Sequence, residues 1–179
     1  GRKALSYINE KLKILDEITA MLRSTGNPVV NITKLMAENT ALKGTVEKMQ
    51  MAAAASARNE LASRAETAGN CRIYSGVIAE TPAETLKNIA HQIRQADSAA
   101  IIVIGSENEG KAALVIGLGD TAAEQANLNA VEMIKAVSSL INGGGGGQPF
   151  LATAGGKRPE GLHEAVAKAV EMAKKSLIQ

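Results

Sequence analysis

Five consecutive glycines, Gly143–Gly147, constrain the fold of this 179-residue chain more than any other feature. Ordering the backbone costs roughly 1–2 kcal/mol per residue, and glycine loses the most conformational freedom. Such a run is therefore either a flexible linker or a shaped loop whose order other contacts stabilise. The residues that follow, 148–179, are too few for an independent domain, and Pro149 stiffens the exit. We expect a shaped loop, which lets backbone N–H groups approach a phosphate or another backbone closely.

The first part of the chain has the pattern of two amphipathic helices. Residues 4–23 place apolar side chains three and four apart, and Ser24–Pro28 has the glycine and proline typical of a helix end. A second helix is predicted over residues 31–68, and its seam contains Asn39, which can fix the register of pairing at some cost in stability. Residues 1–69 are therefore predicted to form a long antiparallel helical hairpin, an interaction element whose helices pair either within one chain or between chains. The two seams are Leu5, Ile8, Leu12, Leu15, Thr19 and Leu22, and Ile32, Leu35, Asn39, Leu42, Val46, Met49 and Ala53.

From residue 70 onward the pattern changes to alternating strands and helices. Strands are predicted at 72–79 and at 99–104, and residues 107–110 predict a hairpin turn into a third strand, 111–118. The order strand-helix-strand-strand-helix-strand-helix predicts a globular α/β domain over residues 70–179, an α+β arrangement with a mixed sheet. The other predicted elements are a helix from a capping box at Thr81–Glu84 to about Ala96, a helix from an Asn129 cap to about Ile141, a strand at Phe150–Ala154 and a final helix over 159–177.

Composition limits the functions that are open to the chain. The net charge is +2, divided as 10 − 7 = +3 over residues 1–70 and 10 − 11 = −1 over residues 71–179. Any nucleic-acid binding by the second part must therefore come from a local patch. No apolar run is long enough to span a membrane, so we expect no membrane partner. The single cysteine, Cys71, fits a reducing, cytoplasmic location, and we interpret it as a small buried hydrophobe.

The sequence contains no recognisable catalytic constellation. Its two histidines, His91 and His163, each stand alone on a predicted helix, and we interpret them as surface or boundary residues. There is no Cys-x-x-Cys or His-x-x-x-His pair, and the glycines within residues 105–119 match neither a dinucleotide fingerprint nor a P-loop. We therefore expect no catalytic residue, no metal ligand and no bound cofactor in this chain.

The most specific pattern is LNAVEMIKAVSSLINGGGGGQPFLATAGGKRPEGLHEAV, residues 128–166. It resembles the C-terminal end of bacterial alanyl-tRNA synthetases, the C-Ala domain, which contains a DHH-associated domain. There, an NA-x-E-[LM]-[IV]-K helix precedes a glycine loop with proline, then A-x-AGGK-x-P-x-x-L and a last helix. The start, GRKALSYINEKL, resembles the junction before the family's helical dimerisation segment. The family often has Arg-Pro-Asp after the glycines. Here Gln148-Pro149-Phe150 replaces that arginine fork by an amide, which can hydrogen-bond bases or ribose.

The resemblance implies a function. The family's full enzyme charges tRNA with alanine and clears mischarged tRNA in a separate editing domain, so ATP, Mg and Zn are expected only in other domains of the parent synthetase. This chain is expected to be non-catalytic, to form a homodimer through its helical hairpin and to hold the elbow of tRNA(Ala) during alanylation and editing. The implied RNA-binding residues are Gly143, Gly144, Gly145, Gly146, Gly147, Gln148, Lys157 and Arg158, with Lys111 and Lys135 in second rank.

Two other functions stay open. One is a purely structural assembly and dimerisation domain, in which the glycines only permit tight packing of the last helix on the sheet. The other is the nucleotide-binding lobe of an oligonucleotide phosphoesterase, because a DHH-associated domain also ends those enzymes. The helical hairpin favours the synthetase.

Overall fold

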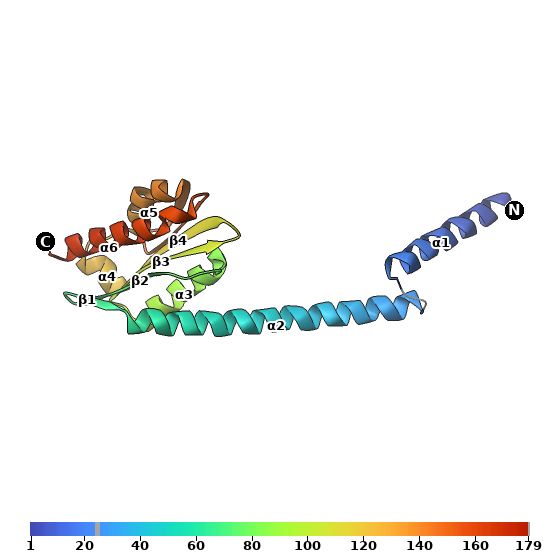
Figure 1. The fold of residues 1–179 in the computed structure, drawn as a ribbon, viewed down its shortest axis with the longest axis horizontal. Helices are drawn as coiled ribbons and strands as arrows, with labels where there is room; N and C mark the ends of the chain where they lie inside the picture. The colour runs from blue at the N-terminus through green and yellow to red at the C-terminus, as the bar shows by residue number, and fades with distance from the viewer. Residues whose placement is uncertain (24–25, 179) are drawn as a thin grey trace. The chain divides into compact units, whose positions relative to one another are not determined.

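The computed structural model describes residues 1–23 and 26–178. The chain divides into two compact units, Gly1–Met49 and Gln50–Gln179. Both predicted N-terminal helices are present, as α1 (Arg2–Met21) and α2 (Pro28–Ser63). The last part of α2 belongs to the second unit, which we call the lobe (Figure 1). The helix end predicted at Ser24 and Thr25 lies outside the described residues.

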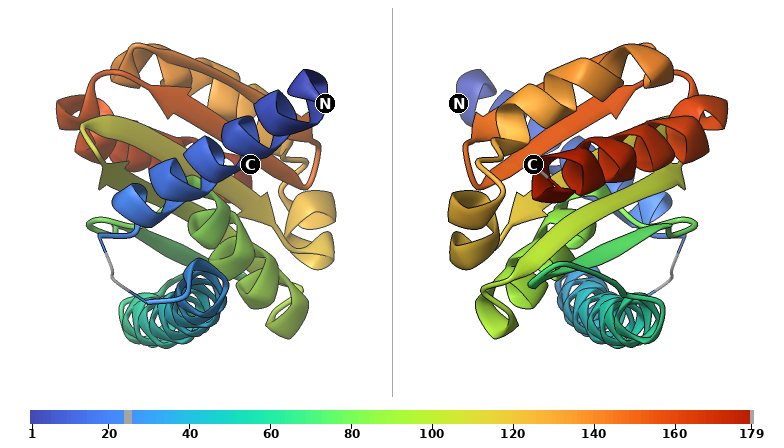
Figure 2. Two further views of the ribbon diagram at one scale, coloured as in Figure 1. Left: turned by 90° about the vertical axis from the view of Figure 1, so that its right-hand side faces the viewer. Right: turned by 90° about the vertical axis from the view of Figure 1, so that its left-hand side faces the viewer.

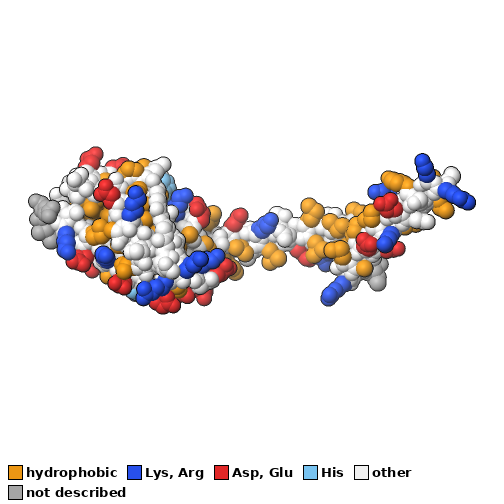
Figure 3. Space-filling view, turned by 90° about the horizontal axis from the view of Figure 1, so that it is seen from above, with side chains coloured by type: hydrophobic (Ala, Val, Ile, Leu, Met, Phe, Trp, Pro, Cys, Tyr) orange, Lys and Arg blue, Asp and Glu red, His pale blue; other side chains and the backbone are white. Residues whose placement is uncertain are grey.

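The first unit consists of helices with exposed apolar seams. No residue of α1 is buried, and in α2 the buried residue is Leu61, which lies in the lobe. Leu5 is 63% exposed and Leu42 is 64% exposed, and hydrophobic side chains gather on the surface of this helical part (Figure 3). Both seams are therefore available for pairing, and the helical hairpin, formed within one chain or between chains, stays a prediction.

The lobe contains a six-stranded mixed sheet with the strand order β1-β2-β3-β4-β6-β5. Strands β2 and β3 are parallel, and every other neighbouring pair is antiparallel. The strands predicted at 72–79, 99–104 and 111–118 are present as β2, β3 and β4. Strands β1 and β5 were not predicted, and β1 lies where the second helix was expected to end. The strands are β1 (Glu66–Ala68), β2 (Cys71–Val77), β3 (Ala100–Asn108), β4 (Lys111–Leu118), β5 (Gly143–Gln148) and β6 (Leu151–Gly156).

The hairpin predicted between the central strands is confirmed. Glu109 and Gly110 lie between β3 and β4 and have φ angles of 51° and 71°. Two consecutive positive φ angles are typical of the tight turns whose twist matches that of paired strands. The turn brings Asn108 opposite Lys111, and both residues reappear below in the candidate site.

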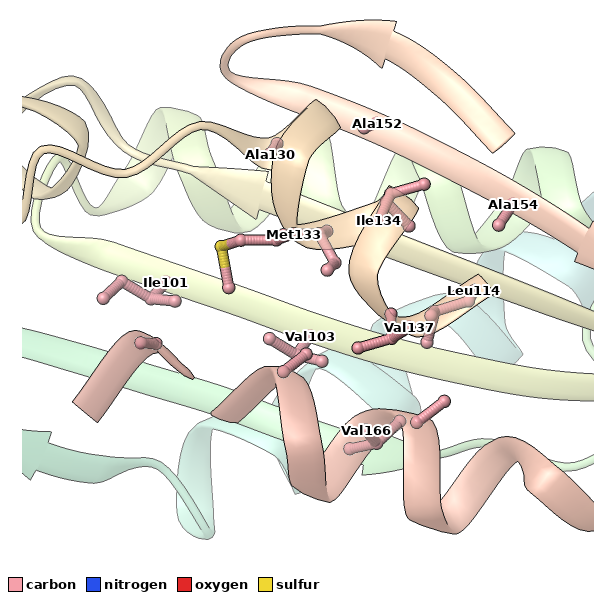
Figure 4. Packing of buried hydrophobic residues seen from close by; sticks show 14 of the residues in the cluster. Ile101, Val103, Leu114, Ala130, Met133, Ile134, Val137, Ala152, Ala154 and Val166 are labelled. Carbon is pink, nitrogen blue, oxygen red and sulfur yellow. The ribbon is translucent and has the colours of Figure 1, made fainter. Parts of the chain in front are cut away.

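Helices cover the two faces of the sheet unequally. Helices α5 (Ala130–Ser138) and α6 (Leu162–Ile178) lie on one face, and α3 (Ala83–Ala96) lies on the other together with the end of α2 (Figure 2). On the first face, Met133 and Val137 of α5 point toward β3 and β4, and Ile134 points toward β6 (Figure 4). Val166 of α6 lies in the same buried cluster. On the second face, Leu61, Tyr74, Leu86, Ile89, Ile102, Ile104 and Val115 form a separate buried cluster.

The helix caps were only partly predictable. Asn129 caps α5 as expected, because its side chain accepts a hydrogen bond of 2.9 Å from the backbone N–H of Val131. That helix ends at Ser138, and a 3-10 turn, Ser139–Ile141, continues it. The capping box at Thr81 was wrong, because the Thr81 hydroxyl donates to the carbonyl of Ala79 and Pro82 takes the cap position. The remaining elements are a short helix, α4 (Asp120–Gln125), and a 3-10 turn, Pro159–Gly161, before α6.

A half-buried carboxylate, that of Asp97, joins β2 to the end of α3. The hydroxyl of Tyr74 and the Nε of Arg72 each lie 2.9 Å from the same carboxylate oxygen of Asp97. The other oxygen accepts from the backbone N–H of Ala99 at 3.1 Å. Burial raises the pKa of the Tyr74 hydroxyl, and its hydrogen bond to Asp97 adds to the shift. Burial likewise raises the pKa of the Cys71 thiol, which is fully buried as predicted.

Candidate nucleic-acid interface

The five glycines form an edge strand of the sheet. Strand β5 pairs antiparallel with β6 in a register that runs from Gly143 opposite Gly156 to Gln148 opposite Leu151. The linker interpretation and the loop geometry were therefore both wrong, while the expectation of an ordered segment is confirmed. Order arises because β6 provides the hydrogen-bonding partner and α5 packs against one side of β5.

Three of the glycines are required by packing. A Cβ atom on Gly145 would lie 2.7 Å from Cγ2 of Ile134 on α5 and 2.7 Å from the Cβ of Ala154 on β6. A Cβ on Gly143 would lie 2.7 Å from the Cα of Gly156, and one on Gly147 would lie 2.7 Å from the Cα of Ala152. Contacts this short do not occur between real atoms, so these alternate positions of β5 accept no side chain.

The glycines between them are not required by packing. A Cβ on Gly144 or on Gly146 would meet no atom within 4 Å, and the same holds for Gly155 on β6. The register places Gly144 opposite Gly155, and Gly146 opposite Thr153, so these residues share one face of the sheet. Glycine destabilises a strand by roughly 0.5–1 kcal/mol relative to alanine. The fold has room for side chains at these three positions, but the sequence has glycine at each of them.

This face of small residues continues from β5 and β6 onto β4. Ala113 of β4 lies opposite Gly155, and Val115 lies opposite Thr153, so two rows of small side chains cross β4, β6 and β5. This is the face on which α3 packs over β3 and β4, whereas α5 covers β5 and β6 from the opposite side. We call the part of this face formed by Ala113, Thr153, Gly155, Gly144 and Gly146 the bare face.

A cavity of about 620 Å³ is lined by Ala113, Thr153 and Gly155 of the bare face, whereas Gly144 and Gly146 lie outside its lining. Two lysines border it: Lys111, which begins β4, and Lys157, which follows β6 directly. Both side chains are exposed, and Glu109 is the acidic residue in the lining. The lining residues are Ala83, Asn108, Glu109, Lys111, Ala112, Ala113, Leu114, Val115, Asn142, Gly143, Thr153, Ala154, Gly155, Gly156 and Lys157.

The structure brings together only some of the residues predicted to bind RNA. Gly143, Lys111 and Lys157 line the cavity, and Gly144, Gly146 and Gln148 lie on the same side of β5 as the bare face. Gly145 and Gly147 face the opposite side, toward α5 and the backbone of β6.

The two remaining predicted cations lie outside the cavity lining. Lys135 is exposed on α5, the helix that covers the opposite face of the sheet. Arg158 is exposed beyond Lys157, and its backbone N–H donates to the carbonyl of Ile141 at 3.0 Å. Lys111 and Lys157 therefore lie on a different face of the sheet from Lys135, and Arg158 is next to Lys157 in the chain but outside the cavity lining.

Sequence reasoning missed four residues of this surface: Asn108, Asn142, Thr153 and Gly155. Gly155 and Thr153 become visible once residues 151–156 are interpreted as a strand, because every second residue then shares a face. Asn142 adopts a left-handed conformation, with a φ of 50°, between the 3-10 turn and β5. The sequence carried no signal that Asn142 and Asn108 lie near each other.

The side chains that line the cavity offer charge and hydrogen-bonding groups. The polar groups of the cavity are two ammonium groups, two amides, a threonine hydroxyl, one carboxylate and exposed backbone. Within residues 1–23 and 26–178, no group of three or more His, Cys, Asp or Glu side chains has an arrangement that suits a metal ion. His91 and His163 are exposed on α3 and α6. None of the described helices combines the length and hydropathy needed to cross a membrane.

The lobe matches a known family of domains. The family model described as the DHHA1 domain matches residues 70–175. The alanine–tRNA ligase of Christiangramia forsetii is 34% identical over 169 residues, which are 94% of this chain and 19% of that protein. The enzyme of the same name from Bacteroides thetaiotaomicron is 34% identical over 171 residues, which are 93% of this chain and 19% of that protein.

A solved structure agrees with these matches. The crystal structure of the C-Ala domain from Aquifex aeolicus alanyl-tRNA synthetase has a TM-score of 0.56 and 33% identity to this chain. The similarity covers 62% of this chain and 98% of that chain. The chain spans about a fifth of the length of the curated relatives that it matches. These findings confirm the resemblance seen in residues 128–166, and because the family model covers more than half of the sequence, the chain belongs to the DHHA1 domain family.

Proposed function

We propose that the lobe binds tRNA through the bare face, as part of an alanine–tRNA ligase. The observation that carries the proposal is the alternation within β5. Packing explains why Gly143, Gly145 and Gly147 are glycines, but it does not explain Gly144 and Gly146. A surface with no side chain larger than threonine, next to two lysines, suits a ligand that comes close to the backbone. Similarity to curated alanine–tRNA ligases and to a C-Ala domain gives that ligand a chemical class.

The surface offers groups of the kinds that recognise RNA. Structured RNA is recognised mainly by its shape, its phosphates and its 2′-hydroxyl groups. Lys111 and Lys157 provide the charge for phosphates, and Asn108 and Asn142 provide amides that donate and accept hydrogen bonds. The overall charge of residues 71–179 is close to zero, so binding has to rest on this local patch and on its shape.

The role of such binding in the parent enzyme is that of a tether. The ATP, Mg and Zn chemistry belongs to other domains of the parent synthetase, and this chain holds the elbow of tRNA(Ala) while the acceptor end moves between active site and editing site. Tethering raises the effective concentration of the acceptor end at the second site. The single, buried, free Cys71 fits the reducing cytoplasm where tRNA is charged.

The bare face is tested by comparing lysines on opposite faces of the sheet. Binding of the full chain to whole tRNA(Ala) is measured by gel shift or fluorescence titration at several salt concentrations. Lys111→Ala and Lys157→Ala are each expected to weaken binding several-fold and to reduce the salt slope by about 1. Lys135→Ala is the matched control, because this lysine is also exposed to solvent but lies on α5. Equal losses for all three variants would remove the bare face from the proposal.

Glycine variants test the shape of the surface. Gly146→Val places a side chain where the fold has room, so the lobe should keep its stability while binding to tRNA falls at least tenfold. A variant that folds and binds normally contradicts the proposed role of the bare face. An acceptor-stem minihelix that binds as tightly as whole tRNA contradicts contact with the elbow. No binding to either RNA at low salt leaves the assembly function in place.

The exposed seams support a second role, self-association of the helical part. Leu5, Leu12, Leu35 and Leu42 are each between 52% and 64% exposed, far more than seam positions in packed helices. We propose that these seams are covered in a homodimer. Sedimentation of the full chain should show two chains per particle at micromolar concentration, and a monomer throughout that range contradicts this role.

A further inference from the structure

The seam of α2 carries enough information to specify how two copies pair. Between residues 32 and 49 its seam positions are exposed on one continuous helix. Ile32, Leu35 and Asn39 border a shallow groove along α2 together with Met36, Thr40 and Lys43. The inference below rests on the proposed self-association and concerns its geometry.

The two kinds of seam position differ in side-chain shape. The seam follows a heptad repeat with two seam positions per heptad. The first of them, the a position, holds Ile32, Asn39 and Val46, which are two β-branched residues and one asparagine. The second, the d position, holds Leu35, Leu42 and Met49, none of which is branched at Cβ. In coiled coils, β-branched residues at the first position with leucine at the second favour two parallel strands, and one asparagine at the first position specifies register and number of strands.

Asn39 discriminates between the two directions of pairing. In a parallel pair in register, first positions meet first positions, so Asn39 faces Asn39 of the second copy and each amide can donate to the other. In an antiparallel pair, first positions meet second positions, and the Asn39 amide lies against leucine or methionine. A buried polar group without a hydrogen-bond partner is strongly disfavoured.

Charges beside the seam select the same direction. Glu38 directly precedes Asn39, and Lys43 directly follows Leu42. In a parallel pair, a residue before one first position lies next to the residue five places later on the other chain. Glu38 of each copy therefore meets Lys43 of the other, which gives two symmetrical ion pairs. Within its own helix, Glu38 also lies 3.9 Å from Lys34, and both side chains remain exposed and available.

We propose that residues 32–49 of α2 pair in parallel and in register with the same residues of a second copy of this chain. The partner of the α2 seam is thus the same helix of a second copy. The experiment must distinguish this parallel pair from an antiparallel pair and from packing of the seam against α1 of the same chain.

Disulfide trapping in the full chain tests the direction of pairing. In a Cys71→Ser background, Ile32→Cys and Met49→Cys are made separately, oxidised under mild conditions and analysed by non-reducing electrophoresis and mass spectrometry. In a parallel pair each variant is linked to itself, because identical positions face each other at bonding distance. In an antiparallel pair centred on the seam, the two sites of one helix lie about 25 Å apart, and only a mixture of both variants is linked, through Cys at 32 and Cys at 49.

Two further variants test the residues that select this geometry. Lys43→Glu is expected to weaken self-association about tenfold, because it places two pairs of carboxylates together, and adding Glu38→Lys should restore most of it. Asn39→Leu should keep or strengthen association but yield particles of more than two chains in sedimentation. The inference is overturned if the double variant does not recover self-association and Asn39→Leu remains a strict dimer.

The outcomes separate this inference from the proposed dimerisation. A monomer in sedimentation with no trapped dimer means that the seams do not join two chains at all. A dimer trapped only in the mixture of the two cysteine variants means that the chain self-associates, but with its helices antiparallel. A dimer in which each variant is linked to itself supports both.

Discussion

The alternation along β5 predicts opposite effects for two neighbouring alanine substitutions. Gly145→Ala adds a methyl group 2.7 Å from both Cγ2 of Ile134 and the Cβ of Ala154, and beside the carbonyl of Thr153. Overpacking of this kind costs typically 1–3 kcal/mol, and the upper part of that range applies where backbone limits relaxation. Alanine itself favours a strand over glycine by roughly 0.5–1 kcal/mol. The lobe should therefore lose about 2 kcal/mol of unfolding free energy.

Gly144→Ala is the matched control. Its new methyl group meets no atom within 4 Å, so only the preference for alanine remains. That variant should gain roughly 0.5–1 kcal/mol, which makes the difference between the two variants about 2–3 kcal/mol.

The single cysteine provides an assay that reports on the lobe alone. Cys71 is fully buried and has no disulfide partner, so a thiol reagent labels it only when the lobe opens. Labelling is followed across a urea gradient for the parent chain and both variants. With a slope of about 2 kcal/mol per molar urea, the two midpoints should differ by about 1 M or more. Equal midpoints, or a lower midpoint for Gly144→Ala, would refute the assignment of β5 to two different faces.

Three further predictions concern the rest of the lobe, and each is read from the same urea-dependent labelling or from circular dichroism. Asn129→Ala removes the cap on the Val131 N–H and should cost about 1 kcal/mol, whereas Asn129→Ser should recover most of that loss. Asp97→Ala leaves the buried hydroxyl of Tyr74 without its acceptor and should cost roughly 2–3 kcal/mol, while normal stability would mean that this bond contributes nothing. The raised pKa of Cys71 means that the folded lobe holds this proton more tightly than the unfolded chain. Stability should therefore fall as pH rises above 9.0, and followed by circular dichroism it should fall less in Cys71→Ala.

The parts of the fold that sequence reasoning predicted are those that local chemistry determines. Asn129 caps its helix through an atom two residues away, and Glu109–Gly110 forms its turn from its own backbone angles. The capping box at Thr81 failed although its motif was local, because Pro82 occupies the cap and the threonine hydroxyl finds the carbonyl of Ala79.

The glycine strand was hidden from sequence reasoning for a different reason. Glycine has a low preference for strands, so nothing within Gly143–Gly147 predicts β structure. The strand exists because β6 lies in the right register and α5 packs on one side. Likewise, the separation of Lys111 and Lys157 from Lys135 depends on which face each residue occupies, and no spacing along the chain contains that information.

The strand order has a consequence for how the chain is completed during synthesis. Strand β6 lies between β4 and β5, although β5 precedes it along the chain. A nascent chain that has reached Phe150 thus carries all five glycines and no neighbour with which they can pair. The next six residues, Leu151–Gly156, form the strand that joins β5 to the sheet. Translation products that stop before this strand therefore lack the bare face.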